Sequence, residues 1–303
     1  MDKKLAPIVL FVYNRLWHTK QTVEALQKNE LANESTLFIY SDGVKNEDTR
    51  KSVDEIRDYI SSIDGFKKVT VIKREKNWGL AANIIDGVTK IVNEYGEIIV
   101  LEDDLVTSKY FLRFMNEALD FYIRDDRVFV ISGHSHPVNI PKKYKYDVYL
   151  GHRSSSWGWA TWRKEWLTIE WDNSVYKSYL EDKKLMIRYA KKGGTDRPKM
   201  LKQQIEGKIN SWAVRRGFTQ FLQKKYTIFP VQSLISNIGH DGSGVHCGIN
   251  KSRNAAKINK SFLPALSTQG IENDKIHRLI NMYHSVSLIP RIVRKIKRIL
   301  DNE

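Results

Sequence analysis

The stretch Glu97-Ile-Ile-Val-Leu-Glu-Asp-Asp104 places three consecutive carboxylates directly after an apolar run. The run is short and rich in isoleucine, valine and leucine, which predicts a buried β-strand. Three adjacent carboxylates repel one another, so this order of residues favours a bound cation at the end of the strand. A hard divalent ion such as Mg²⁺ or Mn²⁺ takes one or two carboxylates together with phosphate oxygens. The structural alternative is a solvated acidic turn that begins the next helix.

Four more apolar runs accompany this strand in the first 135 residues. They predict buried strands at 7–13, 36–41, 68–73 and 127–132, and helical spacing of apolar residues predicts helices at 18–28, 47–63, 80–93 and 108–122, the last with Thr107 and Ser108 as N-caps. This alternation predicts an α/β fold with a Rossmann-like, mostly parallel central sheet flanked by helices. In such a sheet ligands bind at the carboxyl ends of the strands, which is where the three carboxylates stand.

Composition bounds the class of protein. Hydrophobic residues make up 41% and aromatic residues 11% of the chain, which allows a sizeable core and excludes a disordered protein. The single cysteine, Cys247, excludes an internal disulfide and a cysteine-rich zinc module. Fifty basic against 35 acidic residues give a net charge of +15, which suits anionic partners. Because no run approaches the roughly 18 apolar residues of a membrane span, we expect a cytoplasmic protein.

The end of the chain predicts a basic amphipathic helix. Apolar residues at 289, 292, 293, 296, 299 and 300 share one helical face, and lysine and arginine cover the rest. Such a helix suits an anionic membrane surface, and its alternative is docking on the protein's own core or on a second subunit. We expect residues 290–300 to associate peripherally with the inner face of the membrane. Residues 249–285 read as a polar, weakly structured connection.

Four motifs follow one another in a recognisable order. Asn14-Arg15 ends the first strand, Asp42 ends the second in IYSDG, and the carboxylate triplet leads into an aromatic helix in LEDDLVTSKYFLRF. Near the end, residues 235–246 read ISNIGHDGSGVH, a glycine-rich segment. This order resembles the GT-A glycosyltransferases, most closely the N-acetylglucosaminyltransferase I type and its bacterial relatives, over roughly residues 6–248. The last segment looks like the closing serine–glycine loop of that family.

The resemblance implies a nucleotide-sugar-dependent transferase, either a hexosyltransferase or an N-acetylhexosaminyltransferase, that uses a UDP-sugar and Mn²⁺ or Mg²⁺. Asp104 would coordinate the metal that bridges the diphosphate, because the ion neutralises charge on the leaving group. Asp103 would face the ribose or the donor sugar, and Glu102 the sugar or the loop. Arg15 and Asp42 would hold the nucleotide, the arginine as a forked donor and the aspartate as an acceptor from the base.

Three weaker candidates accompany these residues. Asn77 opens a helix after the third strand, a position that favours anionic groups. His240 would contact phosphate, and His246 would be a second metal ligand, in a loop whose glycines permit closure over the diphosphate. The alternatives are structural: Asn77 and Asp42 are also ordinary cap and turn residues, and loop histidines commonly have neither role.

The base that takes the proton from the acceptor hydroxyl is not identified by the resemblance. In the eukaryotic family this base is an aspartate just before a tryptophan, and the matching position in KINSWAVRR is Asn210, which cannot act as a base. Glu206, on the same face if the segment is helical, is one candidate, and Asp196 and Asp241 are the others. A retaining mechanism, which dispenses with that base, is the alternative.

These assignments divide the chain into a GT-A domain at 1–248 and a C-terminal segment at 249–303. The domain has a nucleotide-sugar half at 1–135 and an acceptor-side subdomain at 136–248. Tryptophans crowd residues 157–171, and they either shape an acceptor pocket, since sugar rings pack on aromatic rings, or form core. Together with the basic tail, the resemblance implies a glycan acceptor, lipid-linked, in bacterial surface polysaccharide synthesis.

Two other functions fit parts of the sequence. A sugar-nucleotide nucleotidyltransferase of similar fold would carry a glycine-rich basic segment after the first strand, where this chain has Asn14-Arg15-Leu-Trp17. A nucleic-acid-binding protein would suit the net charge, but it predicts basic residues interleaved with aromatic residues on one surface. Because lysine and arginine are scattered and concentrate only in the tail, we expect no nucleic-acid partner.

Overall fold

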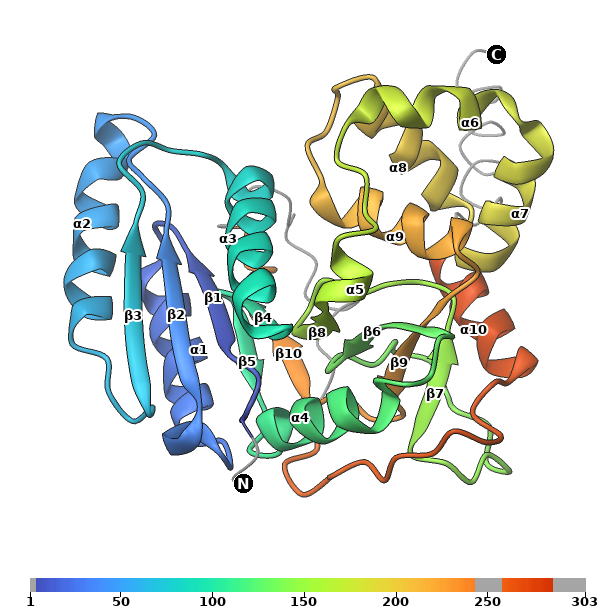
Figure 1. Ribbon diagram of the computed structural model, residues 1–303, viewed down its shortest axis with the longest axis horizontal. Coiled ribbons are helices and arrows are strands. Elements are labelled where there is room, and N and C mark those ends of the chain that lie inside the picture. Colours follow the sequence, from blue (N-terminus) through green and yellow to red (C-terminus); the bar gives the residue numbers. More distant parts are fainter. Residues whose placement is uncertain (1–3, 243–257, 286–303) are drawn as a thin grey trace, which may run out of the picture.

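The computed structural model describes residues 4–242 and 258–285. Eight strands form one sheet in the order β3-β2-β1-β4-β8-β6-β9-β7 (Figure 1). Four of its seven strand pairs are parallel, namely β1 with β2 and β4, β2 with β3, and β6 with β9. A short two-stranded sheet of β5 (Leu105–Thr107) and β10 (Ile235–Asn237) lies beside it. The predicted mostly parallel α/β sheet is confirmed, and antiparallel strands are confined to its second half.

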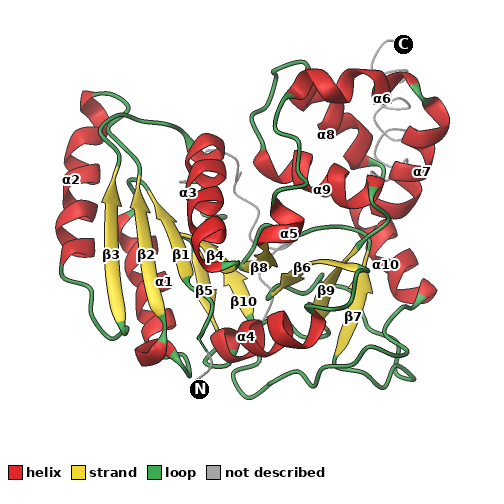
Figure 2. Cartoon of the chain, in the orientation of Figure 1, coloured by secondary structure: helices red, strands yellow, loops and turns green. Residues whose placement is uncertain are grey.

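The first half of the sheet follows the predicted alternation closely. Its strands are β1 (Ile8–Val12), β2 (Thr36–Ser41), β3 (Lys68–Lys73) and β4 (Glu97–Glu102), connected by α1 (Leu16–Gln27), α2 (Glu47–Ser61) and α3 (Leu80–Tyr95). Side chains alternate between the two faces of a strand, so Leu10 and Ile39 pack towards α1 and α2, whereas Phe11 and Tyr40 pack towards α3. Helices therefore cover both faces of this half (Figure 2). Strand β3 lies at the edge and is only partly buried.

The second half inserts later strands into the sheet. Strand β8 (Trp159–Trp162) runs antiparallel between β4 and β6 (Val128–Ser132), followed by β9 (Tyr226–Pro230) and β7 (Val148–Gly151). Trp159 and Trp162 are buried on β8, and Trp166, on the short helix α5 (Arg163–Trp166), stacks on Trp159 with ring centroids 5.6 Å apart. These three tryptophans are core residues.

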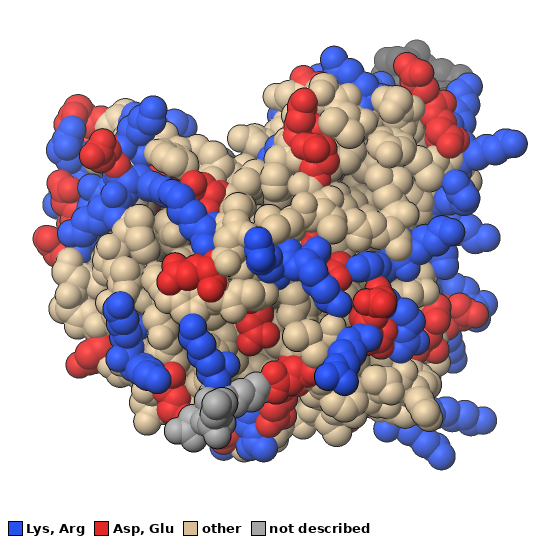
Figure 3. All heavy atoms as spheres, in the orientation of Figure 1, with Lys and Arg blue, Asp and Glu red and all other residues tan. Residues whose placement is uncertain are grey.

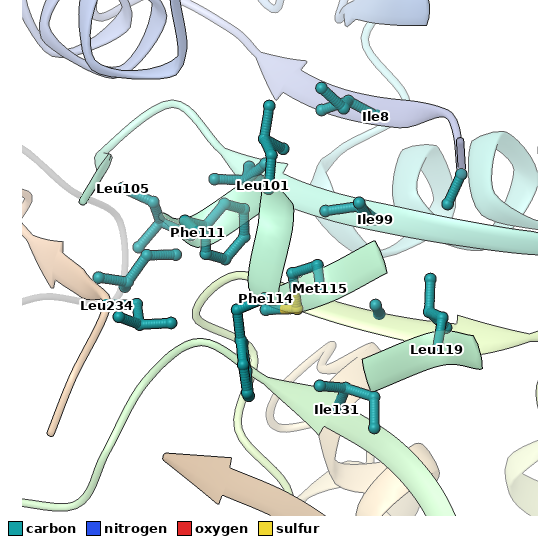
Figure 4. Packing of buried hydrophobic residues seen from close by; sticks show 14 of the residues in the cluster. Ile8, Ile99, Leu101, Leu105, Phe111, Phe114, Met115, Leu119, Ile131 and Leu234 are labelled. Carbon is teal, nitrogen blue, oxygen red and sulfur yellow. The ribbon is translucent and has the colours of Figure 1, made fainter. Parts of the chain in front are cut away.

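Helix α4 (Phe111–Tyr122) anchors the centre of the main core. Phe111, Phe114, Met115 and Leu119 pack against Ile8, Ile99 and Leu101 from the strands, and against Leu105 and Leu234 near the small sheet (Figure 4). The expected caps Thr107 and Ser108 do not begin this helix, because Thr107 ends β5 (Leu105–Thr107). Instead Asn29, 83 residues earlier, accepts the hydrogen bond of the Leu112 amide at 3.0 Å.

A lobe of helices packs over the half of the sheet formed by β8, β6, β9 and β7 (Figure 1). It contains α6 (Lys177–Glu181), α7 (Lys183–Gly193), α8 (Asp196–Ile205) and α9 (Trp212–Leu222), and the face in Figure 3 is hollowed between this lobe and that of β1–β3. The expectation of a weakly structured stretch at 249–285 is wrong for its second part. There α10 (Asp274–His284) buries Ile276 and Ile280 against Tyr149 and Phe229. Its apolar spacing over three turns gives it a packing face.

No helix among the described residues is both long and apolar enough to span a membrane. Residues 290–300, for which a basic amphipathic helix is expected, lie outside the described part of the chain.

Candidate active site at the centre of the sheet

The order β3-β2-β1-β4 makes the gap between β1 and β4 the point where the strand order reverses. Open α/β sheets bind ligands outside the carboxyl ends of the two strands at such a point. Arg15 follows β1 there, and Asp103 and Asp104 follow β4 directly. The Arg15 Nη2 group donates to Asp103 Oδ1 and also to Asp104 Oδ2, the second at 2.9 Å. The structure thus brings together residues that stand 88 positions apart in the sequence.

Both aspartates are nearly buried, and a second segment of chain holds them from the other side. The amide of Ile238 donates to the Asp104 carbonyl at 2.9 Å, and the side-chain amide of Asn237 donates to Asp104 Oδ1 at 3.3 Å. Gly239 follows, so close that a β-carbon there would lie 2.1 Å from Asp104 Oδ2. The beginning of the glycine-rich segment therefore lies directly against the carboxylate, and any side chain at position 239 would push the Asp104 and Arg15 side chains aside.

The charges in this cluster are unbalanced. Burial, and then the neighbouring Asp104 and Asp103, raise the pKa of Glu102 to about 8. Burial raises the pKa of Asp103 to about 6, although the Arg15 guanidinium opposes the shift. Arg15 beside the aspartates and Arg216 near Glu102 offset only part of the charge of three carboxylates in a poorly solvated place, and a cation would relieve the remainder.

The residues present fit a divalent cation. Each Asp104 oxygen accepts one hydrogen bond from the described residues, and a carboxylate oxygen has two lone pairs, so acceptor capacity remains for a metal. Within residues 4–242 and 258–285, no group of three or more histidine, cysteine, aspartate or glutamate side chains is arranged to enclose an ion. This arrangement suits Mg²⁺ or Mn²⁺ held by few protein ligands, with phosphate oxygens and water completing the shell.

A second cluster lies at the end of the neighbouring strand β2. Asp42 Oδ1 accepts hydrogen bonds from the amides of Gly43 and Trp78, at 2.9 and 2.8 Å. Its Oδ2 accepts from the Gly79 amide at 2.9 Å and from the Asn77 side chain at 3.1 Å. The four lone-pair sites of the carboxylate are thus used by the chain itself. Asp42 and Asn77, both expected to contact the nucleotide, in this structure hold the loop that enters α3.

That loop presents an aromatic surface beside the cluster. Trp78 is 38% exposed, and the Arg74 guanidinium lies over its ring at 4.0 Å from the centroid. Arg74 is itself held by Asn83 at 3.0 Å and by Asp86. An exposed indole fixed in this way offers a flat face to a ring of a ligand.

The three candidate bases lie in different surroundings. The carboxylate of Asp241 lies 3.1 Å from Nε2 of His18, which is close enough to Asp103 to influence the pKa of that aspartate. Asp196 forms a two-pronged ion pair with Arg153, at 2.8 and 2.7 Å, at the start of α8. Glu206, at the end of α8, is exposed and pairs with Lys208 at 2.7 Å. Only Asp241 contacts a residue that borders the carboxylate cluster.

Two aromatic rings extend the site towards the second half of the sheet. The ring of Trp157 lies 5.6 Å from that of His240 and 4.6 Å from that of His134. Trp157 is half-buried, unlike Trp159 and Trp162, so it is the member of the tryptophan-rich stretch that borders the site. The other loop histidine, His246, lies outside the described residues.

Two residues of this region were not predicted from the sequence. Asn237 contacts Asp104 although 133 positions separate them, and its one sequence signal is its place just before the glycine-rich segment. Arg216 is completely buried between Trp159 and Trp212, at 4.2 and 4.6 Å from their ring centroids, and it donates to the Ser155 carbonyl. Its charge and that of Glu102 influence each other's pKa. The motif WAVRR contains Arg216, but nothing in it distinguishes a buried arginine from an exposed one.

Comparisons with solved structures find distant similarity. A mannosyltransferase, PcManGT from Pyrobaculum calidifontis in complex with GDP-Man and Mn²⁺, is 10% identical over 54% of this chain and 48% of that one, with a TM-score of 0.35. TarS of S. aureus, residues 1–349, is 9% identical over 76% of this chain and 59% of that one, with a TM-score of 0.39. The chain thus spans only about half of the length of these structures.

No curated protein sequence matches the chain significantly. Residues 8–218 match the family described as glycosyl transferase family 2, which covers more than two thirds of the sequence and both strands of the switch point. The chain therefore belongs to glycosyl transferase family 2.

Proposed function

We propose that this glycosyltransferase moves a sugar from a UDP-sugar to a glycan acceptor, with Mn²⁺ or Mg²⁺ held by Asp104, as the resemblance to the N-acetylglucosaminyltransferase I type implies. One observation carries the proposal. Asp103 and Asp104 meet Arg15 at the switch point of the sheet, the place where such sheets bind nucleotides. A metal there would stabilise the charge that develops on the leaving diphosphate.

The residues around Asp104 have defined tasks in this proposal. Arg15 bridges the two carboxylates through Nη2 and offsets their repulsion, and its Nη1 group would donate to a phosphate. Asn237 and Gly239 hold the following loop against Asp104, so that loop position depends on what the carboxylate binds. Asp42 acts on the donor indirectly, because it fixes Trp78, whose exposed ring would pack on the nucleobase.

For the acceptor we propose Asp241 as the base of an inverting reaction. Its side chain is 47% exposed and lies beside His18 at the edge of the carboxylate cluster. A base must reach the acceptor hydroxyl while remaining near the metal-bound donor, and this position meets both needs. Asp196 and Glu206 pair instead with Arg153 and Lys208, residues that take no part in the carboxylate cluster. Trp157 would pack on the sugar ring of the acceptor.

The wider role is also a proposal. A lipid-linked acceptor in bacterial surface polysaccharide synthesis, met at the inner face of the membrane, rests on the basic residues of 290–300 and on the bacterial side of the resemblance.

The proposal is tested by a donor screen that measures UDP release from a panel of UDP-sugars, with and without Mn²⁺. We expect metal-dependent release from one donor, and a rise in thermal stability when UDP and Mn²⁺ are added together. Asp104→Asn preserves the shape of the side chain but removes its charge, so it should lower release at least about 100-fold and abolish the stability increase. Asp58→Asn, an exposed change of the same kind on α2, is the control and should alter neither.

The proposal fails if no UDP-sugar is bound or hydrolysed, or if Asp104→Asn still shows the full stability increase with UDP and Mn²⁺. Release of pyrophosphate from a nucleoside triphosphate and a sugar phosphate would instead identify a nucleotidyltransferase.

A further inference from the structure

A groove in the acceptor half lies between α7 and α10. Its volume is about 650 Å³, and its walls come from the last turns of α7, the length of α10 and the residue that follows β7. The two helices are joined by the Asn281 side chain, which donates to the carbonyl oxygens of Ala190 and Lys191 at the end of α7. They lie side by side in Figure 1. The groove is thus a rigid feature between packed elements.

Three cations line this groove against one carboxylate. Lys191, Lys192 and Arg278 are exposed, and Asp274 is the single acidic residue of the lining. Among the described residues, none of the three cations forms an ion pair within 4 Å. Lys192 donates instead to Nε2 of His152, at 3.1 Å. A concave wall with a net charge of one sign attracts a ligand of the opposite sign.

The floor of the groove consists of aromatic rings rather than charges. The lining rings of His152 and His277 lie 4.3 Å apart. Tyr226, which is not itself part of the lining, supports them: its ring is tilted against His152 at 4.8 Å and stacks on His277 at 6.3 Å. His277 donates from Nε2 to the Leu150 carbonyl at 2.6 Å, and His152 accepts from a lysine, so each ring has a fixed orientation. Burial keeps the pKa of both imidazoles below its usual value, so both are neutral at pH 7. Flat neutral rings of this kind pack well on the apolar face of a sugar.

The groove and the candidate active site are connected by one short loop. His152 begins the loop between β7 and β8 and lines the groove, and Trp157 near its end lies beside His240. Five residue steps span at most about 18 Å, so a chain of several sugars could reach from one place to the other. The lining cations call for an acidic ligand, the rings on the floor suit sugar faces, and the short distance allows the ligand to be one end of a glycan that also reaches the active site.

We propose that the groove between α7 and α10 binds an anionic segment of the acceptor glycan, one that carries carboxylate or phosphate groups on its sugars. The cations would contact the acidic groups, and the ring floor would pack on the sugar faces. This inference rests on the proposed glycan acceptor, but its test measures binding and needs no transfer reaction.

The test titrates the whole protein with three hexasaccharides and follows binding by calorimetry. One probe is oligogalacturonate, the second is maltohexaose carrying phosphate groups, and the third is fully methyl-esterified oligogalacturonate, which is neutral. We expect at least one acidic probe to bind about tenfold or more tightly than the neutral one, with affinity that falls as salt is added. Which acidic probe binds better identifies the anionic group.

The matched variants locate the binding. Lys192→Gln combined with Arg278→Gln should weaken binding of the acidic probe about tenfold, the loss expected for two partly exposed charge contacts. Lys183→Gln combined with Lys184→Gln removes the same charge from the other end of α7 and should leave binding within about twofold, because distant exposed charges are screened. Both pairs should keep the stability increase with UDP and Mn²⁺.

The inference is overturned if the neutral probe binds as tightly as both acidic ones, or if the two double variants lose affinity equally. Binding of an acidic probe together with a failure to bind UDP would leave the groove as a glycan site and remove the proposed transferase donor.

Discussion

Two aspartate sites at neighbouring strand ends differ in where their hydrogen bonds come from. Asp42, after β2, accepts four hydrogen bonds from Gly43, Asn77, Trp78 and Gly79, three of them from backbone amides. The Asp104 carboxylate, after β4, accepts only from the side chains of Arg15 and Asn237 among the described residues, and both side chains can rotate away without moving the backbone. One carboxylate is part of the backbone framework, and the other is available to a ligand.

The same difference appears in the glycines beside the two aspartates. A β-carbon on Gly43 would lie 2.3 Å from the backbone carbon of Lys76, which cannot yield without moving the end of β3. A β-carbon on Gly239 would instead meet the side chains of Asp104 and Arg15. The first glycine allows two backbone segments to meet, whereas the second allows a loop to approach a carboxylate.

Replacing each aspartate with asparagine should give the largest difference between the structural role of Asp42 and the ligand-binding role proposed for Asp104. Asp42→Asn turns an acceptor oxygen into a donor that faces the Gly79 and Asn77 donors, so it should lower the free energy of unfolding by about 3 kcal/mol. Asp104→Asn relieves repulsion as well as losing a bond, and should change it by less than about 1 kcal/mol. Urea denaturation of both variants without ligand measures the two values. Equal losses would contradict the comparison.

The carboxylate cluster at Asp104 is visible in the sequence, whereas the internal hydrogen bonding of Asp42 is not, because the two require different kinds of information. Adjacent carboxylates after an apolar strand are visible in a linear pattern, and so is their place at a strand end. The four donors to Asp42 are mostly backbone amides, which every residue carries, so nothing in the letters indicates that its acceptor capacity is used internally.

The same distinction holds for the fold: elements set by local sequence periodicity were predicted, whereas arrangements set by long-range contacts were not. Elements β1 to β4 and their helices follow local periodicity, and β2 and β3 were predicted with the bounds that they have in the structure. The insertion of β8 between β4 and β6 depends on pairing with β4 across about 60 residues, so the tryptophans on it could not be separated into core and pocket. For α10, polar residues on the exposed face concealed the apolar spacing that buries Ile276 and Ile280.

Alanine substitutions at the two glycines should have different effects, one mainly on the free energy of unfolding and the other mainly on ligand binding. Gly43→Ala forces a backbone shift and should cost about 2 kcal/mol of unfolding free energy. Gly239→Ala displaces flexible side-chain ends and should cost less than about 1 kcal/mol, while it removes most of the stability increase given by UDP and Mn²⁺. Thermal unfolding with and without these ligands checks both variants. If Gly239→Ala kept the whole increase, the loop would not depend on the carboxylate.

The smallest expected effect is a loss of folding stability when the pH is lowered, and it determines the pH at which the two aspartates should be compared. Burial lowers the pKa of His134 to about 3, so the native state binds fewer protons there than the unfolded chain at pH values below about 6.5. Stability therefore falls as the pH is lowered through that value, by about 0.7 kcal/mol for this histidine between pH 7 and pH 6. His134→Asn should reduce the measured loss over that interval by this amount, in urea denaturation at the two pH values. An unchanged or larger loss in the variant would mean that His134 is not the neutral buried group that its surroundings indicate. Comparisons of Asp42 and Asp104 belong at about pH 8 or above, where this histidine is almost fully neutral in the unfolded chain as well and contributes almost no slope.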